Sequence, residues 1–279
     1  MAEAQKRIAL VNDLTGFGRC SIAVQLPVVS AMRVQGCPLP TALLSVHTGF
    51  PDWVSRDCTD LFGPWTGSWR RTGLSFDAVL AGWLGSVRQV GAVEDFVREF
   101  KKPGTLFVMD PVMGDNGRLY GSHTPELCER MRALAAMADV LTPNLTEACR
   151  LLGRPWPEGG AAAPEQLAEM AEALSALGPR RVVVTGVADP ADASALVNYV
   201  HERDRPDETV RAARIGGDRS GAGDVFSAVV AAALVRGRDF AAAVRDAAAF
   251  VSRCVALAEE LRLPWNWGLP VEEFLSSLA

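Results

Sequence analysis

Short apolar runs alternate with longer segments of helical periodicity along most of the chain. Turn residues bound the apolar runs, which predict strands at residues 8–11, 41–46, 78–81, 106–109, 140–141 and 181–185. The longer segments predict helices at residues 94–100, 125–137, 165–177, 221–235 and 240–261. This alternation is typical of βαβ units, so we expect an α/β fold with a central, mostly parallel sheet covered by helices.

Two further strand candidates, residues 195–200 and 209–213, flank the polar stretch HERDRPD. They predict an antiparallel hairpin late in the sheet. Residues 154–164 are rich in Pro, Gly and Ala, and we interpret them as a surface loop between two helices rather than a domain linker. No internal repeat is visible, and we expect residues 1–279 to form a single domain.

Charge and composition narrow the class of partner. The formal net charge is -5 with both signs scattered, which gives no basic stripe for nucleic acid and no polybasic arm for lipid. The chain begins without a signal-peptide pattern, and no apolar run approaches the roughly 18 residues of a membrane helix. Six dispersed cysteines without a CxxC pair are typical of reduced cytosolic thiols. We therefore expect a cytoplasmic protein with a small-molecule partner, no nucleic acid and no membrane.

The segment GGDRSGAGD, residues 216–224, opens the apolar helix predicted at residues 221–235. Glycines allow a ligand to approach the backbone closely, and free N–H groups at a helix start bind anions such as phosphate oxygens. Asp224 beside that anion could accept the proton of an attacking hydroxyl. The alternative interpretation is that Asp224 only caps the helix after a glycine turn.

Two more segments carry carboxylates at the ends of predicted elements. DPVMGD spans residues 110–115, and TPNLTE spans residues 142–147. Asp110 ends a predicted strand and Glu147 begins a helix, so both can face the crevice at the strand carboxyl ends, where Mg²⁺ would suit them. Alternatively, Asp110 braces a turn and Glu147 favours a helix N-terminus. The chain has no GxxxxGK[ST], which disfavours a P-loop kinase.

In this order, DPVMGD, TPNLTE and GAGD resemble motifs of the ribokinase-like superfamily, and more closely of its vitamin B6 branch, the pyridoxal or pyridoxamine kinases. The resemblance covers most of the chain. It implies a ribokinase-like three-layer sandwich and an ATP-dependent kinase in which GAGD supplies the anion hole and the catalytic base. The catalytic residues that it implies are Gly221, Ala222, Gly223 and Asp224.

The resemblance also implies ATP and Mg²⁺ as cofactors, and it leaves a monovalent cation open. Asp110 and Glu147 would hold the metal. Dimers are common among these relatives, so we expect a homodimer. The residues implied on the nucleotide side are Asp110, Asp115, Thr142, Asn144, Thr185, Gly186, Gly221 and Gly223.

On the substrate side, vitamin B6 kinases contact the pyridine ring through three positions that this chain matches at Asp13, Thr48 and Trp83. His47 is a further candidate, and Cys20 could present a thiol to an aldehyde substrate. Asp13 stands where these kinases often have serine, and Trp83 replaces their common tyrosine. As residues alone, Asp13 could equally be a turn residue and Trp83 a core residue.

The expected function is phosphorylation of the hydroxymethyl group of pyridoxamine, pyridoxal or pyridoxine. A hydroxymethylpyrimidine or sugar kinase of the same fold stays open, because an aromatic ring at Trp83 stacks on a pyridine or a pyrimidine alike. A catalytically silent metabolite-binding protein is the alternative from another class.

Overall fold

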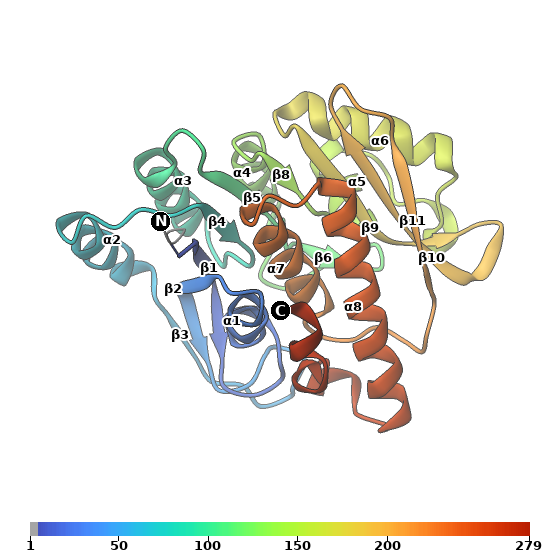
Figure 1. The fold of residues 1–279 in the computed structure, drawn as a ribbon, viewed down its shortest axis with the longest axis horizontal. Helices are drawn as coiled ribbons and strands as arrows, with labels where there is room; N and C mark the ends of the chain where they lie inside the picture. Colours follow the sequence, from blue (N-terminus) through green and yellow to red (C-terminus); the bar gives the residue numbers. More distant parts are fainter. Residues whose placement is uncertain (1–4) are drawn as a thin grey trace.

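Figure 1 shows the computed structural model, which describes residues 5–279. One sheet of nine strands runs through the molecule in the order β11-β10-β9-β8-β5-β4-β1-β2-β3. The strands are β1 Arg7–Thr15, β2 Gln35–Leu44, β3 Ser55–Asp57, β4 Ala78–Ala81, β5 Leu106–Met109, β8 Val140–Leu141, β9 Arg181–Asp189, β10 Asp192–Glu202 and β11 Glu208–Ala213. A separate two-stranded hairpin consists of β6 Gly114–Asp115 and β7 Arg118–Leu119.

The centre of the sheet is parallel and its edges are antiparallel. β1 pairs in parallel with β2 and β4, and parallel pairing continues through β5, β8 and β9. β3 closes one edge, and the β10–β11 pair extends the other in antiparallel orientation. β4 has the composition of a strand covered by helices on both faces, because all of its residues are apolar and buried. The mostly parallel sheet and the late hairpin predicted from the sequence are confirmed.

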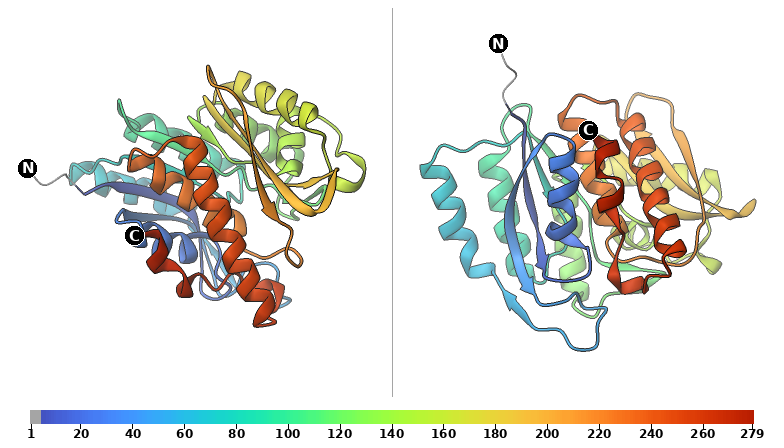
Figure 2. Two further views of the ribbon diagram at one scale, coloured as in Figure 1. Left: turned by 45° about the vertical axis from the view of Figure 1, so that its right-hand side comes forward. Right: turned by 60° about the horizontal axis from the view of Figure 1, so that its bottom comes forward.

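Helices cover both faces of the sheet (Figure 2), and one apolar core lies between the sheet and the helices on each face. Side chains alternate along β1, so Ile8 and Leu10 enter the core beneath α1, α7 and α8, while Ala9 and Val11 enter the opposite core. The predicted three-layer sandwich is therefore confirmed. The helices are α1 Ser21–Ala31, α2 Phe62–Arg71, α3 Val87–Phe100, α4 Pro125–Ala135, α5 Leu145–Leu152, α6 Pro164–Leu177, α7 Ala222–Val235 and α8 Phe240–Glu260.

The bounds of β4, β5 and β8 match the predicted ranges, whereas β1 differs at a point that matters for function. β1 runs on to Thr15, so the predicted strand at residues 8–11 is too short, and Asn12 and Asp13 lie within the strand rather than after it. Their side chains are held by strand geometry rather than by a loop. β2 begins at Gln35 and ends at Leu44, earlier than predicted at both ends.

α1 and α2 were not predicted and both contain residues that disfavour a helix, whereas α5 was anticipated only through Glu147 at a helix start. α1 has Pro27 in its interior, and α2 contains Gly63, Pro64 and Gly67. Interior proline costs about 3 kcal/mol and glycine about 1 kcal/mol relative to alanine. Burial outweighs this in α1, where Ile22, Val24, Val28 and Val29 are all buried against the sheet.

Candidate active site

The N-terminus of α7 presents free backbone amides at the carboxyl ends of the parallel strands. Gly221 caps the helix with φ +78°, and a Cβ placed there would lie 2.1 Å from the carbonyl oxygen of Arg19. Within residues 5–279, the N–H groups of Gly223 and Asp224 have no hydrogen-bond partner. Two free N–H groups at a helix start form a binding site for a phosphate oxygen.

Asp224 is fixed beside these amides by two donors. Its Oδ1 accepts from Asn12 Nδ2 at 2.9 Å, and its Oδ2 accepts from the backbone N–H of Ser21 at 2.8 Å. Ser21 has φ +53°, which is uncommon for a residue with a side chain, and this conformation directs its N–H to the carboxylate. Burial raises the pKa of Asp224 to about 7, and the nearby charge of Asp13 adds to the shift. A carboxylate with a near-neutral pKa suits a general base.

Asn12 is a site residue that the sequence analysis missed. It is fully buried, and its Oδ1 accepts from the backbone N–H groups of Asp13 at 3.0 Å and Trp83 at 2.9 Å. Because the oxygen is thereby assigned, the amide NH₂ must face Asp224. The available signal was a polar residue in the interior of an apolar strand, which burial permits only with bonding partners.

Asp13 lies next to this group and is itself held by hydroxyls. Its two oxygens accept from Thr15 Oγ1 at 2.7 Å and from Ser21 Oγ at 2.6 Å. Burial raises its pKa, and the hydroxyl bonds oppose that shift. Cys20 is buried beside the same carboxylates, and burial raises its pKa to about 12. Its thiol therefore stays protonated at neutral pH, which is opposite to what a reactive cysteine needs.

The other predicted substrate residues lie on two segments that follow the strands. Trp83 follows β4 and is tied to the site through its N–H to Asn12, while its carbonyl accepts from Thr41 Oγ1 at 3.2 Å. Thr48 is exposed on the segment after β2. His47 is partly buried there, and both of its ring nitrogens bond to protein groups. The substrate roles of Trp83, Thr48 and His47 stay predictions.

Asp110 and Glu147 form a second pair of buried carboxylates, with Asp110 near Asp224. Glu147 accepts from the backbone N–H of Met113 at 3.1 Å and of Asn144 at 2.9 Å. The side-chain oxygen of Asn144 accepts in turn from the backbone N–H of Glu147, and the two residues form a capping box at the start of α5. Burial raises the pKa of Glu147, and the charge of Asp110 raises it further. Burial likewise raises the pKa of Asp110, with a contribution from Asp224. The charged forms of both carboxyl groups are therefore disfavoured where they stand.

These residues fit a magnesium ion only in part. Among residues 5–279, no three His, Cys, Asp or Glu side chains come together as a metal site. Two carboxylates are nevertheless what Mg²⁺ commonly takes from a protein when nucleotide phosphates and water complete its shell. A cation beside Asp110 and Glu147 would also offset the charge of Asp110, which adds to the raised pKa of Glu147. The donor set is therefore compatible with Mg²⁺ held jointly with a nucleotide.

The remaining predicted nucleotide residues lie just after β8, within β9 and on β6. Thr142 is buried with a hydroxyl that has no partner within residues 5–279. Thr185 donates from Oγ1 to the carbonyl of Pro143 at 3.4 Å, and Gly186 follows with φ +64°. Asp115 is exposed on β6. An unpaired buried hydroxyl is costly unless a ligand or water completes it, so Thr142 is suited to contact one.

Tyr120 is a second residue that the sequence analysis missed. It is 44% exposed, just after β7, and its N–H donates to the carbonyl of Met113. Partial burial raises the pKa of its phenol, and the charges of Glu147, Asp115, Asp110 and Asp224 raise it further. A neutral hydroxyl there can donate a hydrogen bond to a bound anion. No sequence pattern marked it.

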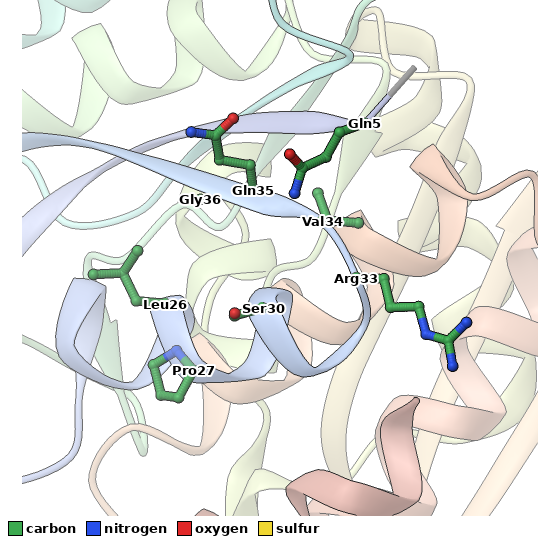
Figure 3. A pocket seen from close by; sticks show the side chains of 8 residues that line it. All are labelled: Gln5, Leu26, Pro27, Ser30, Arg33, Val34, Gln35 and Gly36. Carbon is green, nitrogen blue, oxygen red and sulfur yellow. The ribbon is translucent and has the colours of Figure 1, made fainter. Parts of the chain in front are cut away.

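A separate depression lies near the start of β2, away from the candidate active site at the carboxyl ends of the strands (Figure 3). The second half of α1 and the start of β2 line it, with residues that include Leu26, Ser30, Arg33 and Gln35. Among residues 5–279, its lining holds no carboxylate and no free helix N-terminus. The described part of the lining therefore offers neither a general base nor an anion hole for phosphoryl transfer.

Comparisons with known proteins match most of the chain. A family model described as phosphomethylpyrimidine kinase matches residues 66–266. The pyridoxal kinase of Sus scrofa is 31% identical over 205 residues, which make up 67% of this chain but only 62% of the pig protein. The pyridoxal kinase of Leifsonia xyli is 27% identical over 251 residues, which cover 86% of this chain and 84% of that relative.

A solved structure matches nearly the whole fold. A Bacteroides thetaiotaomicron protein, provisionally assigned as a phosphomethylpyrimidine kinase and crystallised with pyridoxal, superposes with a TM-score of 0.94 and 36% identity. The match covers 98% of this chain and 96% of that one. The relatives and this structure confirm the resemblance drawn from the motifs, including the ribokinase-like fold.

Proposed function

The chain belongs to the phosphomethylpyrimidine kinase family, and from this premise we propose that it is an ATP-dependent kinase for a B6 vitamer. The acceptor is the hydroxymethyl group of pyridoxamine, pyridoxal or pyridoxine. The observation that carries the proposal is Asp224, a carboxylate of near-neutral pKa held beside two free amides at a helix start. Curated relatives named pyridoxal kinase, and the related structure crystallised with pyridoxal, support the vitamer as acceptor.

In the proposed reaction, the hydroxyl oxygen of the acceptor attacks the γ-phosphate of ATP and ADP leaves. Asp224 accepts the proton of that hydroxyl. The bonds from Asn12 and Ser21 keep the carboxylate oriented while the acceptor binds. The amides at the start of α7, including that of Gly223, stabilise the charge that spreads over the transferring phosphoryl oxygens. Trp83, Asp13 and Thr48 are proposed to line the acceptor ring.

The proposal includes ATP with Mg²⁺. Asp110 and Glu147 would hold the ion, which when bound would offset negative charge on the phosphates. Thr142, Asn144, Thr185, Gly186 and Asp115 are proposed contacts of the nucleotide phosphates. A monovalent cation stays a prediction from the resemblance alone.

We further propose one kinase domain over residues 1–279, acting as a homodimer in the cytoplasm. The single nine-stranded sheet supports one domain. All six cysteines are free thiols, which supports a reducing compartment. Within residues 5–279, no helix has the length and apolar character needed to span a membrane. The dimer rests on the resemblance.

A transfer assay tests the proposed function. Purified protein incubated with Mg-ATP and each vitamer should form ADP and phosphorylated vitamer in equal amounts. Equal yields follow because the amides and Asp224 direct the γ-phosphate to the acceptor rather than to water. ADP formed without any phosphorylated vitamer would contradict the proposal.

A pyrimidine acceptor is the second candidate, and the family model's own description favours it. Trp83 can stack on either ring, and the acidic Asp13 differs from the serine expected for a vitamin B6 kinase. Hydroxymethylpyrimidine therefore belongs in the same transfer assay as the competing acceptor.

The pH dependence of turnover should reveal the raised pKa of Asp224. The base works only when ionised, and its pKa is about 7, so kcat should fall as pH decreases through about 7. An unshifted carboxylate would keep kcat level down to about pH 5. Measuring kcat with saturating Mg-ATP and vitamer between about pH 5.5 and about pH 9 distinguishes the two profiles.

A further inference from the structure

The turn that follows α8, residues 263–267, gathers hydrogen bonds from three loops around the candidate active site. Its sequence is LPWNW, and its last three residues form a 3-10 turn, Trp265–Trp267. We name residues 263–267 the carbonyl turn, residues 45–50 the substrate loop, residues 16–20 the first loop and residues 216–221 the anion-hole loop. These segments are far apart in the sequence and meet at the edge of the sheet where the strands end.

Each loop bonds to a different carbonyl oxygen of the carbonyl turn. From the anion-hole loop, Arg219 Nη1 donates to Leu263, and the N–H of Ser220 donates to Trp265 at 3.2 Å. From the substrate loop, His47 Nε2 lies 2.7 Å from the carbonyl oxygen of Asn266. From the first loop, Arg19 Nη1 donates to the carbonyl of Trp267 at 3.4 Å. One short turn therefore links the substrate side to the phosphate side.

His47 is fixed as a donor to this turn. The backbone N–H of Gly49 donates to His47 Nδ1 at 3.1 Å, so Nδ1 must be the unprotonated nitrogen. Nε2 then carries the hydrogen and donates it to Asn266. With both nitrogens engaged in protein bonds, the ring has no free polar atom for a substrate.

Close packing supports the same arrangement. Gly18 has φ +109°, and a Cβ there would lie 2.5 Å from His47 Cδ2, so only glycine lets the first loop approach the histidine. The His47 ring meets Trp265 edge-on with 6.1 Å between centroids, and Phe17 meets Trp267 at 5.5 Å. The substrate loop and the first loop are thus packed against the turn as well as bonded to it.

The anion-hole loop is held by a buried group. The side chain of Arg219 is 7% exposed, and its Nη2 pairs with Glu259 of α8 at 2.6 Å. Because a buried guanidinium has few alternative partners, its bond to Leu263 fixes the anion-hole loop relative to the carbonyl turn. A displacement of the carbonyl turn would therefore move the start of α7 and its free amides.

We propose that the carbonyl turn is a positioning element that holds the substrate loop in register with the anion-hole loop, and that His47 is a positioning residue acting through this turn. Its effect on the reaction rests on the proposed function, whereas the mechanical link between the loops does not. His47 then influences acceptor binding without touching the acceptor.

The test replaces His47 with phenylalanine, which keeps an aromatic ring and removes the donor, and with glutamine, which can return an N–H near the position of Nε2. Hydrogen–deuterium exchange is measured without ligands on peptides that contain Ser220. His47→Phe should speed exchange at the Ser220 amide severalfold, because its bond to Trp265 loosens, and His47→Gln should restore protection. His201→Phe is the matched control, because His201 lies on β10, pairs with Asp207 and bonds to none of the four named segments.

Kinetics supply the second readout. His47→Phe should raise the acceptor KM by about five- to tenfold, the effect of one lost hydrogen bond, and His47→Gln should reverse most of the increase. A raised acceptor KM with unchanged exchange at Ser220 would mean that His47 contacts the acceptor directly, and would overturn the proposal. Unchanged exchange with unchanged KM would overturn it as well.

A variant on the other side covers the case in which His47→Phe does not fold. Arg219→Lys keeps the positive charge near Glu259 but loses the guanidinium fork that also reaches Leu263. Exchange should then speed up at Gly49 and Phe50 of the substrate loop, and unchanged exchange there overturns the link. If no vitamer is phosphorylated by the wild type, the exchange results still decide this proposal separately from the proposed function.

Discussion

Replacing Asp224 with asparagine should lower turnover by about 10²–10⁴-fold, the loss expected when a general base is removed. The amide has nearly the same shape as the carboxylate, so the start of α7 and its free N–H groups should keep their positions. ATP binding, measured by calorimetry, should therefore change little while kcat falls. Turnover equal to that of the wild type would contradict the role of Asp224 as the base.

The same variant carries a stability signature that a helix cap alone would lack. The pKa of Asp224 is about 7 in the folded protein, against about 3.9 for an unfolded aspartate. A raised folded pKa contributes stability that is fully present below about pH 4 and is lost as pH rises through about 7. The melting temperature of Asp224→Asn relative to wild type should therefore increase between about pH 5 and about pH 8. A constant difference would mean that the pKa is not raised.

Replacing Gly221 with alanine should lower kcat by about 10²–10³-fold, as expected when anion-hole donors are displaced. Gly221 has φ +78°, a conformation that costs a residue with a side chain about 1–2 kcal/mol, and the new Cβ would lie 2.1 Å from the carbonyl oxygen of Arg19. A backbone oxygen cannot rotate away as a side chain can. The start of α7 must shift, and the amides move with it.

Gly217→Ala is the matched control, four residues earlier in the same glycine-rich segment. A Cβ at Gly217 would meet no heavy atom within 4 Å, and no left-handed backbone conformation is required there. Both variants add one methyl group, so kcat and melting temperature should fall much less for Gly217→Ala. Comparable losses in the two variants would show that the geometry of the Gly221 turn is not what positions the amides.

The sequence carried enough information to predict the fold and one half of the site. β4, β5 and β8 are apolar along their whole length and end at turn residues, so their bounds could be predicted correctly. Glycine at residue 221 and carboxylates at residues 110, 147 and 224 stand at the ends of predicted elements, so the sequence could place them on one side of the sheet. These are signals of composition and spacing, which a sequence displays directly.

The groups that orient Asp224 could not be predicted in this way. Asn12 meets Asp224 across 212 residues of sequence, and Ser21 contributes a backbone N–H whose direction depends on an unusual φ angle. The carbonyl turn acts through backbone oxygens, which every residue possesses. Such contacts depend on how the segments fold together, so only the three-dimensional structure reveals them.

A direct competition between acceptors tests the central claim, which is phosphoryl transfer from ATP to a B6 vitamer. Wild-type protein with Mg-ATP is given pyridoxal, pyridoxine, pyridoxamine and hydroxymethylpyrimidine together, and the ratio of phosphorylated products gives the ratio of kcat/KM values. At least one vitamer should be phosphorylated at least about tenfold faster than the pyrimidine, and transfer should fall by about 10²–10⁴-fold in Asp224→Asn. Preferential phosphorylation of hydroxymethylpyrimidine, or vitamer phosphorylation at the wild-type rate in Asp224→Asn, would contradict the account.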